Sequence, residues 1–286
     1  MKTFDSRAIE LTIRLGTGTF GEGLGDTVTL SGLRMFVDVA APCGESMGAI
    51  QMRVFGLQQS MMNQLTTIGV FGQVAGSSQI LVSAGNEGEA LTEIFKGSIW
   101  QAWADYNNAP EVAFNIIGYV GMNIALKPVK PTPYPESVDV ATAMQTFATQ
   151  AGYAFHNSGV NKTLPASYWD RDLLTQIKSC ARDADIYYKI ENGTLTIWPK
   201  DGYVEGGKPL ISPETGMVGY PSISSQGMMI KTLFIPGIVM GGLIEVKSSI
   251  KMASGTFRVL NYTHSLSAVA VGGPWFTEIL CFPLLK

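Results

Sequence analysis

The stretch KPVKPTPYPES, Lys127 to Ser137, divides this chain of 286 residues into parts with different hydrophobic periods. Its four prolines lack backbone amide donors and hold the backbone extended, so we expect a semi-rigid linker over residues 127–137. Strand-like patterns dominate residues 1–126, helical periods and one hairpin fill residues 138–200, and strands return over residues 201–286. The sequence therefore predicts a mainly β protein in which a small α/β domain separates two antiparallel β domains.

The first part has the period of half-buried strands. Ile9, Leu11, Ile13 and Leu15 alternate with polar residues, as they do on a strand with one buried face. Further β-rich runs, separated by Gly, Asn, Pro and Ser, are 27–30, 33–39, 49–55, 79–83, 93–103 and 112–119. This spacing predicts antiparallel hairpins. One short helix is expected within SMMNQLTTIG, with Ser60 as its N-cap and Gly69 at its end.

The middle part changes to a helical period. The apolar positions of the first expected helix are Val140, Met144, Phe147, Ala148 and Ala151, with Ser137 as N-cap and Gly152 as C-terminal stop. A second helix from about Asp170 places Leu173, Leu174, Ile177, Cys180, Ala181 and Ala184 on one face. After it, IYYKIENGTLTIWP predicts a hairpin, because Asn192-Gly193 suits a type I′ turn. A two-residue loop there pairs Ile190 with Leu195 and Tyr188 with Ile197.

The composition indicates which classes of binding partner to expect. Hydrophobic residues make up 46% of the chain and charged residues only 15%, yet no apolar run reaches the roughly 20 residues of a membrane span. We therefore expect no membrane insertion, and an apolar, uncharged surface that other protein chains cover. A net charge of −3 with scattered basic residues argues against nucleic-acid binding.

Neither the N-terminal sequence nor the cysteines suggest secretion. The N-terminal sequence lacks the pattern of a signal peptide. The three cysteines, Cys43, Cys180 and Cys281, are odd in number and far apart, so they predict neither a disulfide framework nor a metal site. Synthesis in a reducing cytoplasm is the simplest interpretation.

One motif imitates a nucleotide site. Gly16-Thr-Gly-Thr-Phe-Gly21 matches GxGxxG after a predicted strand, and Asp38 follows at a suitable distance for a ribose. Pyrophosphate binding also requires a helix to begin after the glycines. The sequence instead continues EGLGDTVTL, which predicts a long hairpin loop. We expect no cofactor here.

Other residues capable of catalysis do not form a recognisable set. His156 and His264 are the only histidines and lie in different predicted domains. Carboxylate pairs for glycoside hydrolysis could be chosen from Glu87, Glu89, Asp105 and Glu111, whereas Asp183 and Asp185 suit a helix end. Alternation places Trp100 and Trp103 on opposite faces of a strand, near Tyr106, which favours structural or subunit contacts over a ligand platform. We predict no catalytic residue and no metal site.

Several stretches together resemble a known family. GTGTFGEGLGDTVTLSGLRMFVDVA, MRVFGLQQSMMNQLTTIG, IFKGSIWQAWADYNNAPEVAF, YKIENGTLTIWP and LISPETGMVGYPSI followed by GGLIEVKSS are similar to segments of the baseplate hub proteins of contractile-tailed bacteriophages, in the same order. The family comprises Mu-type hubs and their T4-type relatives. The resemblance implies two tail-tube-like β-barrel domains separated by an α/β domain.

The resemblance also implies function and partners. Hubs of this family are homotrimers whose two tube-like domains per chain present a pseudo-sixfold ring to the hexameric tail tube protein and threefold symmetry to the trimeric spike protein. A central channel would pass the tape measure protein and then DNA, and other baseplate proteins would surround it. The chain is thus expected in the virion tail, assembled in the host cytoplasm, with no enzymatic role. The alternatives are a peptidoglycan- or carbohydrate-active tail enzyme, and a hub or tube component of a bacterial contractile injection system.

Two glycine- and proline-rich stretches are candidates for assembly. The loop containing Gly16, Gly18 and Gly21 is a plausible contact toward the tube or a neighbouring subunit. In ISPETGMVGYPSI, Ile211 to Ile223, the Ser, Glu and Thr have no nearby His or Lys in the sequence. We interpret this segment as a joint that sets the second β domain against the first. The residues that shape it are Pro213, Gly216, Gly219 and Pro221.

Overall fold

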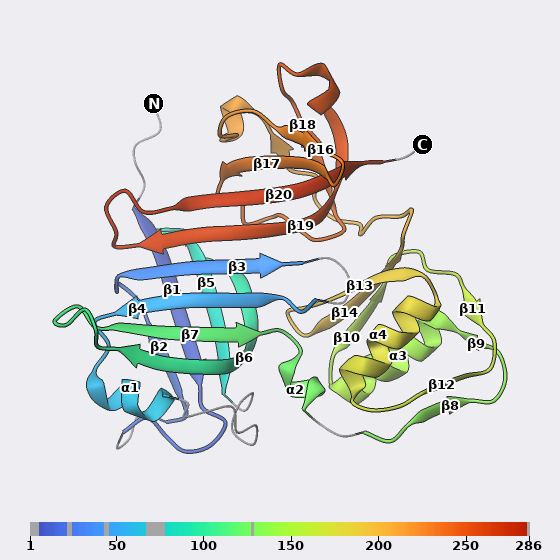
Figure 1. Ribbon diagram of the computed structural model, residues 1–286, viewed down its shortest axis with the longest axis horizontal. Coiled ribbons are helices and arrows are strands. Elements are labelled where there is room, and N and C mark those ends of the chain that lie inside the picture. Colours follow the sequence, from blue (N-terminus) through green and yellow to red (C-terminus); the bar gives the residue numbers. More distant parts are fainter. Residues whose placement is uncertain (1–5, 22–24, 43–45, 67–77, 127–128, 285–286) are drawn as a thin grey trace.

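The computed structural model describes residues 6–21, 25–42, 46–66, 78–126 and 129–284. Strands predominate, and a compact group of two helices and short strands packs beside them (Figure 1). The mainly β class with an α/β module is therefore confirmed.

The N-terminal β segment folds into two layers. Its elements are β1 (Arg7–Arg14), β2 (Thr27–Leu30), β3 (Met35–Ala41), β4 (Ala49–Phe55), α1 (Gln59–Leu65), β5 (Gln79–Asn86), β6 (Thr92–Asp105), β7 (Ala113–Tyr119) and α2 (Met122–Ala125). Strands β1 and β5 cross behind β3, β4 and β7 (Figure 1). Ile9, Leu11 and Ile13 are buried between the layers, which confirms the alternation predicted for β1.

Strand β6 links the two layers. Residues 92–98 pair with β5 and residues 98–105 pair with β7, so the two neighbours occupy different halves of one 14-residue strand. The register shifts at Val82/Ser83 of β5 and again between Ile99 and Gln101 of β6. Bulges of this kind bend a strand and increase its twist, which lets a single sheet turn back over its own core.

The C-terminal β segment continues the same sheet. Its elements are β15 (Leu210–Ile211), the 3₁₀ helix η1 (Pro213–Thr215), β16 (Ser222–Ser224), β17 (Gly227–Leu233), β18 (Leu243–Val246), η2 (Lys251–Ala253), β19 (Gly255–Ala268) and β20 (Trp275–Pro283). Strand β19 pairs with β3 from Tyr262 opposite Ala41 to Ala268 opposite Met35. A 13-stranded sheet results, in the order β16-β17-β20-β19-β3-β4-β7-β6-β5-β1-β2, with β15 and β18 attached beside β19. Among the described strands, no pairing closes this sheet into a barrel.

The α/β module lies at one end of these strands. Its elements are β8 (Thr132–Tyr134), β9 (Val138–Asp139), α3 (Val140–Ala151), β10 (Ala154–Asn157), β11 (Thr163–Leu164), β12 (Ser167–Trp169), α4 (Leu173–Asp183), β13 (Ile186–Glu191) and β14 (Thr194–Pro199). Helices α3 and α4 cover one face of β10-β14-β13, and Phe147 meets Trp169 edge-on with 5.7 Å between ring centroids. The proline-rich segment supplies β8, which pairs with β12.

The predicted hairpin is confirmed residue by residue. Ile190 pairs with Leu195 and Tyr188 with Ile197, and Asn192 and Gly193 have φ values of +50° and +72°. The other face of this hairpin buries Trp198 against the C-terminal β segment. The module is therefore packed onto the large sheet through the side of β13 and β14 that faces away from the helices.

Two predicted helix caps are wrong. Asp139, and not Ser137, caps α3, because residues 138–139 are held extended as β9 and the Asp139 carboxylate accepts from Thr142 N at 2.9 Å. Helix α1 already includes Ser60 and has Gln58 at its N-cap, whereas Gly69 lies outside the described residues. The C-terminal stop at Gly152, with φ +74°, is confirmed.

His264 is buried where the two β segments meet. Its Nδ1 lies 2.8 Å from Thr277 Oγ1, and the rings of Phe234 and Tyr262 pack against it at centroid distances of 5.2 and 4.8 Å. Burial lowers the pKa of His264 to about 4, since an imidazolium would lose its hydration there. This histidine is thus a neutral packing residue of β19.

This burial predicts a pH-dependent stability. The pKa of His264 is lower in the folded protein than in the unfolded chain. The contribution of the neutral imidazole to the free energy of unfolding is therefore complete above about pH 6.5 and is lost as the pH falls toward 4. A shift of this size corresponds to roughly 3 kcal/mol in the free energy of unfolding. Urea denaturation across this pH range should show the loss in wild type and in His156→Gln, where the histidine is exposed. The same loss in His264→Gln would contradict the assignment.

Candidate assembly interface

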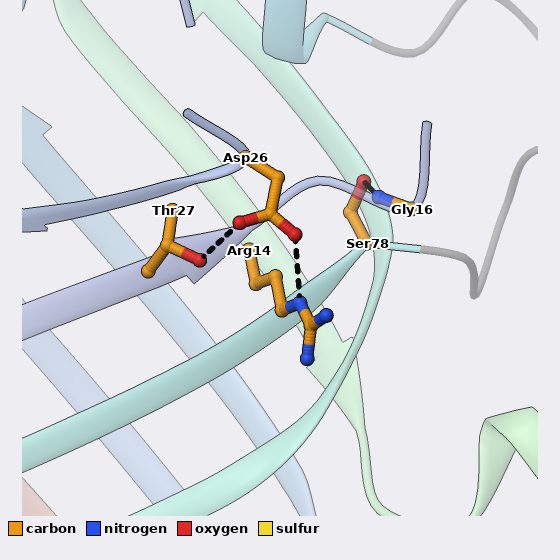
Figure 2. A network of polar contacts seen from close by, with 5 residues as sticks. All are labelled: Arg14, Gly16, Asp26, Thr27 and Ser78. Carbon is orange, nitrogen blue, oxygen red and sulfur yellow. Dashed lines mark hydrogen bonds and ion pairs between the residues drawn. The ribbon is translucent and has the colours of Figure 1, made fainter. Parts of the chain in front are cut away.

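The loop between β1 and β2 is closed at its base by polar contacts. Asp26 accepts from Arg14 Nε at 3.0 Å and from Thr27 Oγ1 at 2.9 Å, as Figure 2 shows. The hydrogen bond from Thr27, followed by that from Arg14, lowers the pKa of the Asp26 carboxyl. Gly16 N donates to Ser78 Oγ at 3.4 Å, which ties the loop to the start of β5.

An aromatic side chain anchors the same loop. Phe20 is only 2% exposed and belongs to the first core, while Gln64 Nε2 donates to Thr19 O at 2.6 Å. The predicted contact residues Gly16, Gly18 and Gly21 are exposed around this anchor. The next element in the described residues is strand β2, so the helix that a pyrophosphate site requires does not follow in them.

The predicted joint is an ordered turn. Ser212 N donates to Thr215 Oγ1 at 2.8 Å, and Ser212 Oγ donates to Glu214 Oε2 at 2.6 Å. That hydrogen bond from Ser212 lowers the pKa of the Glu214 carboxyl. The polar residues of ISPETG therefore form hydrogen bonds with one another and stabilise a 3₁₀ turn that begins at Pro213.

The turn is fastened to β17 through Gly216. The Gly216 carbonyl accepts from Leu233 N at 2.8 Å and from Thr232 Oγ1 at 3.1 Å. Gly216 has φ +112°, and an added Cβ would lie 3.1 Å from Leu233 Cβ. Gly219 also has a positive φ, of +71°, but with open space around it, and Pro221 is buried before β16. These four predicted joint residues thus belong to one connection.

The carboxylates considered for glycoside hydrolysis lie at the surface, and three of them bind neighbouring side chains. Arg34 contacts both carboxylate oxygens of Glu111, at 2.9 and 3.4 Å, and this lowers the pKa of Glu111. A general acid for glycoside hydrolysis needs a raised pKa, so the shift is in the wrong direction. Glu89 accepts from Asn86 Nδ2 at 3.1 Å, Asp105 accepts from Asn107, and Glu87 is exposed.

The other residues considered for catalysis or metal binding either interact with neighbouring side chains or are buried. Asp183 accepts from Trp169 Nε1 at 3.0 Å, and Asp185 forms an ion pair with Lys200. Cys180 and Cys281 are buried, which raises the pKa of each thiol to about 12, and Cys43 lies outside the described residues. In the part of the chain that the structure describes, no group of three His, Cys, Asp or Glu residues could hold a metal ion.

Simple alternation predicts that the two tryptophans of β6 point to opposite faces of the sheet, and this prediction is wrong. Trp100 is the extra residue of the bulge between Ile99 and Gln101. It meets Tyr119 edge-on, with 6.5 Å between ring centroids, and Tyr119 shares its face of β7 with Asn115, the partner of Trp103. The bulge therefore returns both tryptophans to the outer face of the sheet.

An unpaired strand edge lies at one side of the outer layer. Eight neighbouring strands, β16-β17-β20-β19-β3-β4-β7-β6, form this layer. On one side, β16 has β17 as its single described strand neighbour. Open edges carry free amides and carbonyls and are templates for pairing with another chain.

Exposed apolar side chains concentrate in the C-terminal β segment, which carries this edge. Eleven of the fourteen large apolar side chains that are exposed in the described ranges lie between Tyr203 and Val271. They include Tyr220, Ile223 and Met229 beside or within β16 and β17, which are 74%, 57% and 41% exposed. Apolar surface of this kind marks contacts with other proteins. These side chains are therefore candidates for the surface that we expect neighbouring chains to cover.

Solved structures with the same fold come from phage tails and a secretion system. The E. coli c3393 protein, a component of the type VI secretion system with structural similarity to T4 bacteriophage tail proteins gp27 and gp5, matches with a TM-score of 0.62 and 11% identity, over 88% of this chain and 74% of that chain. A tail protein from Neisseria meningitidis MC58 matches with a TM-score of 0.62 and 9% identity, over 96% of each chain. The 43 kDa tail protein of prophage MuSo2 from Shewanella oneidensis matches with a TM-score of 0.61 and 8% identity, over 96% of this chain and 97% of that chain. No curated protein sequence matches this chain.

The fold of this chain is therefore one that occurs in solved phage tail proteins and in a secretion-system protein. Within that class, the family model for baseplate hub gp41 matches residues 9–272, and the chain belongs to this family. The resemblance to baseplate hubs is therefore confirmed, and the family is a structural component of the bacteriophage tail. None of the helices in the described ranges is both long and apolar enough to cross a membrane.

The joint predicts a sharp contrast between two glycines. Gly216→Val should lower the free energy of unfolding by at least about 2 kcal/mol, because a β-branched residue is strained at this φ and collides with Leu233. Gly219→Asn should change it by less than about 0.5 kcal/mol, since Asn tolerates positive φ and the space is open. Urea denaturation measures both. Equal midpoints for Gly216→Val and wild type would show that the joint has no structural role.

Proposed function

We propose that this protein is a homotrimeric baseplate hub that adapts a hexameric tail tube to a trimeric spike. The observation that carries the proposal is the single outer layer of eight strands, which ends at β16 with one described strand neighbour and exposed apolar side chains around it. In a ring of three copies the contacts are heterologous, so the β16 edge of each copy would meet a different surface of the next copy.

The proposed subunit contact uses the open edge of β16 of one copy, which would meet the next copy in the ring. Ile223 and Tyr220 would then leave water at the contact, near the exposed apolar side chains of the C-terminal segment. Trp100 and Trp103 lie on the outer face of β6 and offer aromatic surface to a neighbouring copy. Trimer formation would thereby cover apolar surface that the isolated chain exposes.

The proposed partners follow from the ring. Two β segments per chain give six tube-like units in three copies, which matches a sixfold tail tube protein, while threefold symmetry remains for the spike protein. The central opening would pass the tape measure protein and DNA, and other baseplate proteins would bind the outside. The likeness of the E. coli secretion-system component to T4 gp27 and gp5 supports a tail assembly role for this fold.

One alternative has a specific observation in its favour. The same similarity to a type VI secretion component supports a hub of a bacterial contractile injection system, which would use the same ring and the same partners. The tail enzyme alternative lacks such support, because the candidate carboxylates are exposed and bound to local partners. We therefore propose a non-enzymatic assembly protein.

Native mass spectrometry of the purified chain tests the proposal. We expect a species near three times 30.8 kDa, and co-elution of that species with the spike protein of the same tail in size-exclusion chromatography. A chain that stays monomeric at micromolar concentration, and that does not co-elute with the spike protein at any salt concentration, would overturn the hub assignment.

A single charged substitution tests whether the edge of β16 forms the subunit contact. Ile223→Lys places an ammonium group on an edge strand, and edge charges prevent strand pairing. Because Ile223 is 57% exposed, the unfolding midpoint of the monomer should stay within about 1 °C of wild type. The trimer should weaken at least tenfold by mass photometry. Tyr168→Lys, at a residue 64% exposed on the α/β module, is the matched control and should keep the trimer. Trimers of equal strength in both variants would rule out β16 as the contact.

A further inference from the structure

The strand at the open side of the sheet is longer than β16 alone. Residues 216–218 also pair with β17, through two backbone hydrogen bonds of 2.8 Å on either side of the bridge between Met217 and Thr232. Strand β16 begins with Ser222 opposite Met229 of the same neighbour. Both parts therefore belong to one edge strand that runs along β17.

A bulge interrupts this edge strand. Between the two paired parts, residues 218–221 lie opposite only residues 230–231 of β17, so the edge strand has two residues more than its neighbour. We call residues 219–221 the bulge. Gly219 has φ +71°, which bends the chain, and Pro221 has no amide that a further strand could use.

The N-terminal β segment has an uninterrupted strand at the corresponding place. The strand orders β3-β4-β7-β6-β5 and β16-β17-β20-β19-β18 follow the same chain connections, and all their pairings are antiparallel. In the first order, β3 pairs with β4 on one side and with β19 on the other, and neither register contains a shift. The bulge thus occurs in the one of these two strands whose second side has no described strand neighbour.

The side chains of this edge strand favour association. Residues 216–224, GMVGYPSIS, contain no charged residue, and Val218, Tyr220 and Ile223 are 39%, 74% and 57% exposed. Long edge strands with exposed apolar side chains are templates for pairing with other chains, and proteins protect them with charges, prolines or bulges. Since this strand has no charges, the proline and the bulge are the protective features that it contains.

From these observations we propose that the bulge at residues 219–221 prevents two copies of this chain from pairing edge to edge. Every copy carries the same edge strand, and two identical strands can pair antiparallel about a twofold axis without any other protein. Such a dimer would cover the edge that the proposed ring contact uses. With the bulge in place, backbone pairing is confined to the three residues of β16, so a lasting contact at this edge needs complementary side chains on the partner.

Deletion of Tyr220 and Pro221 tests the bulge. The loss of two residues leaves the alternation of side chains along the edge strand unchanged. In sedimentation-velocity ultracentrifugation we expect a species of twice 30.8 kDa that forms at least tenfold more tightly than any dimer of wild type. Ile223→Lys added to the deletion should abolish this dimer, because edge charges prevent strand pairing. Tyr220→Ala, which removes the aromatic ring and keeps both extra residues, is the control and should not form it.

A second variant covers the case in which the deletion disrupts folding. Pro221→Val keeps the full length, restores one amide and should dimerise more weakly than the deletion variant but more tightly than wild type. If neither variant dimerises more tightly than wild type, the inference is wrong. Dimers of the deletion variant that persist with Ile223→Lys would mean association through another surface and would also overturn it. The hub function is judged separately, on whether wild type forms trimers.

Discussion

The pairing of β19 with β3 is the contact on which the rest of the structure depends. It joins strands more than 200 residues apart, from Tyr262 opposite Ala41 to Ala268 opposite Met35, and so makes one sheet from two β segments. Ser265 Oγ donates to the Asp38 carboxylate at 2.6 Å on the outer face, while His264 and Leu266 are buried behind it. Without this ladder each segment would have an additional open edge, and neither could present the eight-stranded layer.

The α/β module is fixed to this sheet by a second long-range contact. Tyr262, within the β19 ladder, donates through its hydroxyl to Glu191 Oε1 at 3.2 Å, and Glu191 pairs with Lys189 Nζ at 2.7 Å. Trp198 and Tyr187 pack between the module and the C-terminal core. One strand thus connects all three parts of the chain. Such close packing of the three parts suits the proposed adaptor role, because packed interiors transmit strain.

The features that the sequence predicts are local, and those it misses are long-range or irregular. The Asn192-Gly193 hairpin and the buried faces of α3 and α4 follow from neighbouring residues, so periodicity and turn chemistry suffice. Alternation identifies the buried face of β19 but not its partner, so β3 could not be predicted. The bulge at Trp100 reverses the expected faces of β6 because one extra residue breaks the two-residue period. For the Gly16–Gly21 loop, its single aromatic, Phe20, is the signal that could have indicated an anchored loop.

The central claim is that this open sheet is completed by other copies of the same chain. Hydrogen–deuterium exchange of the purified oligomer, compared with the Ile223→Lys monomer, measures that completion directly. The claim predicts slowed exchange in the oligomer at the amides of residues 222–224, because strand pairing would occupy the free edge of β16. Equal exchange at this edge in oligomer and monomer would contradict it, and would mean that copies assemble through another surface.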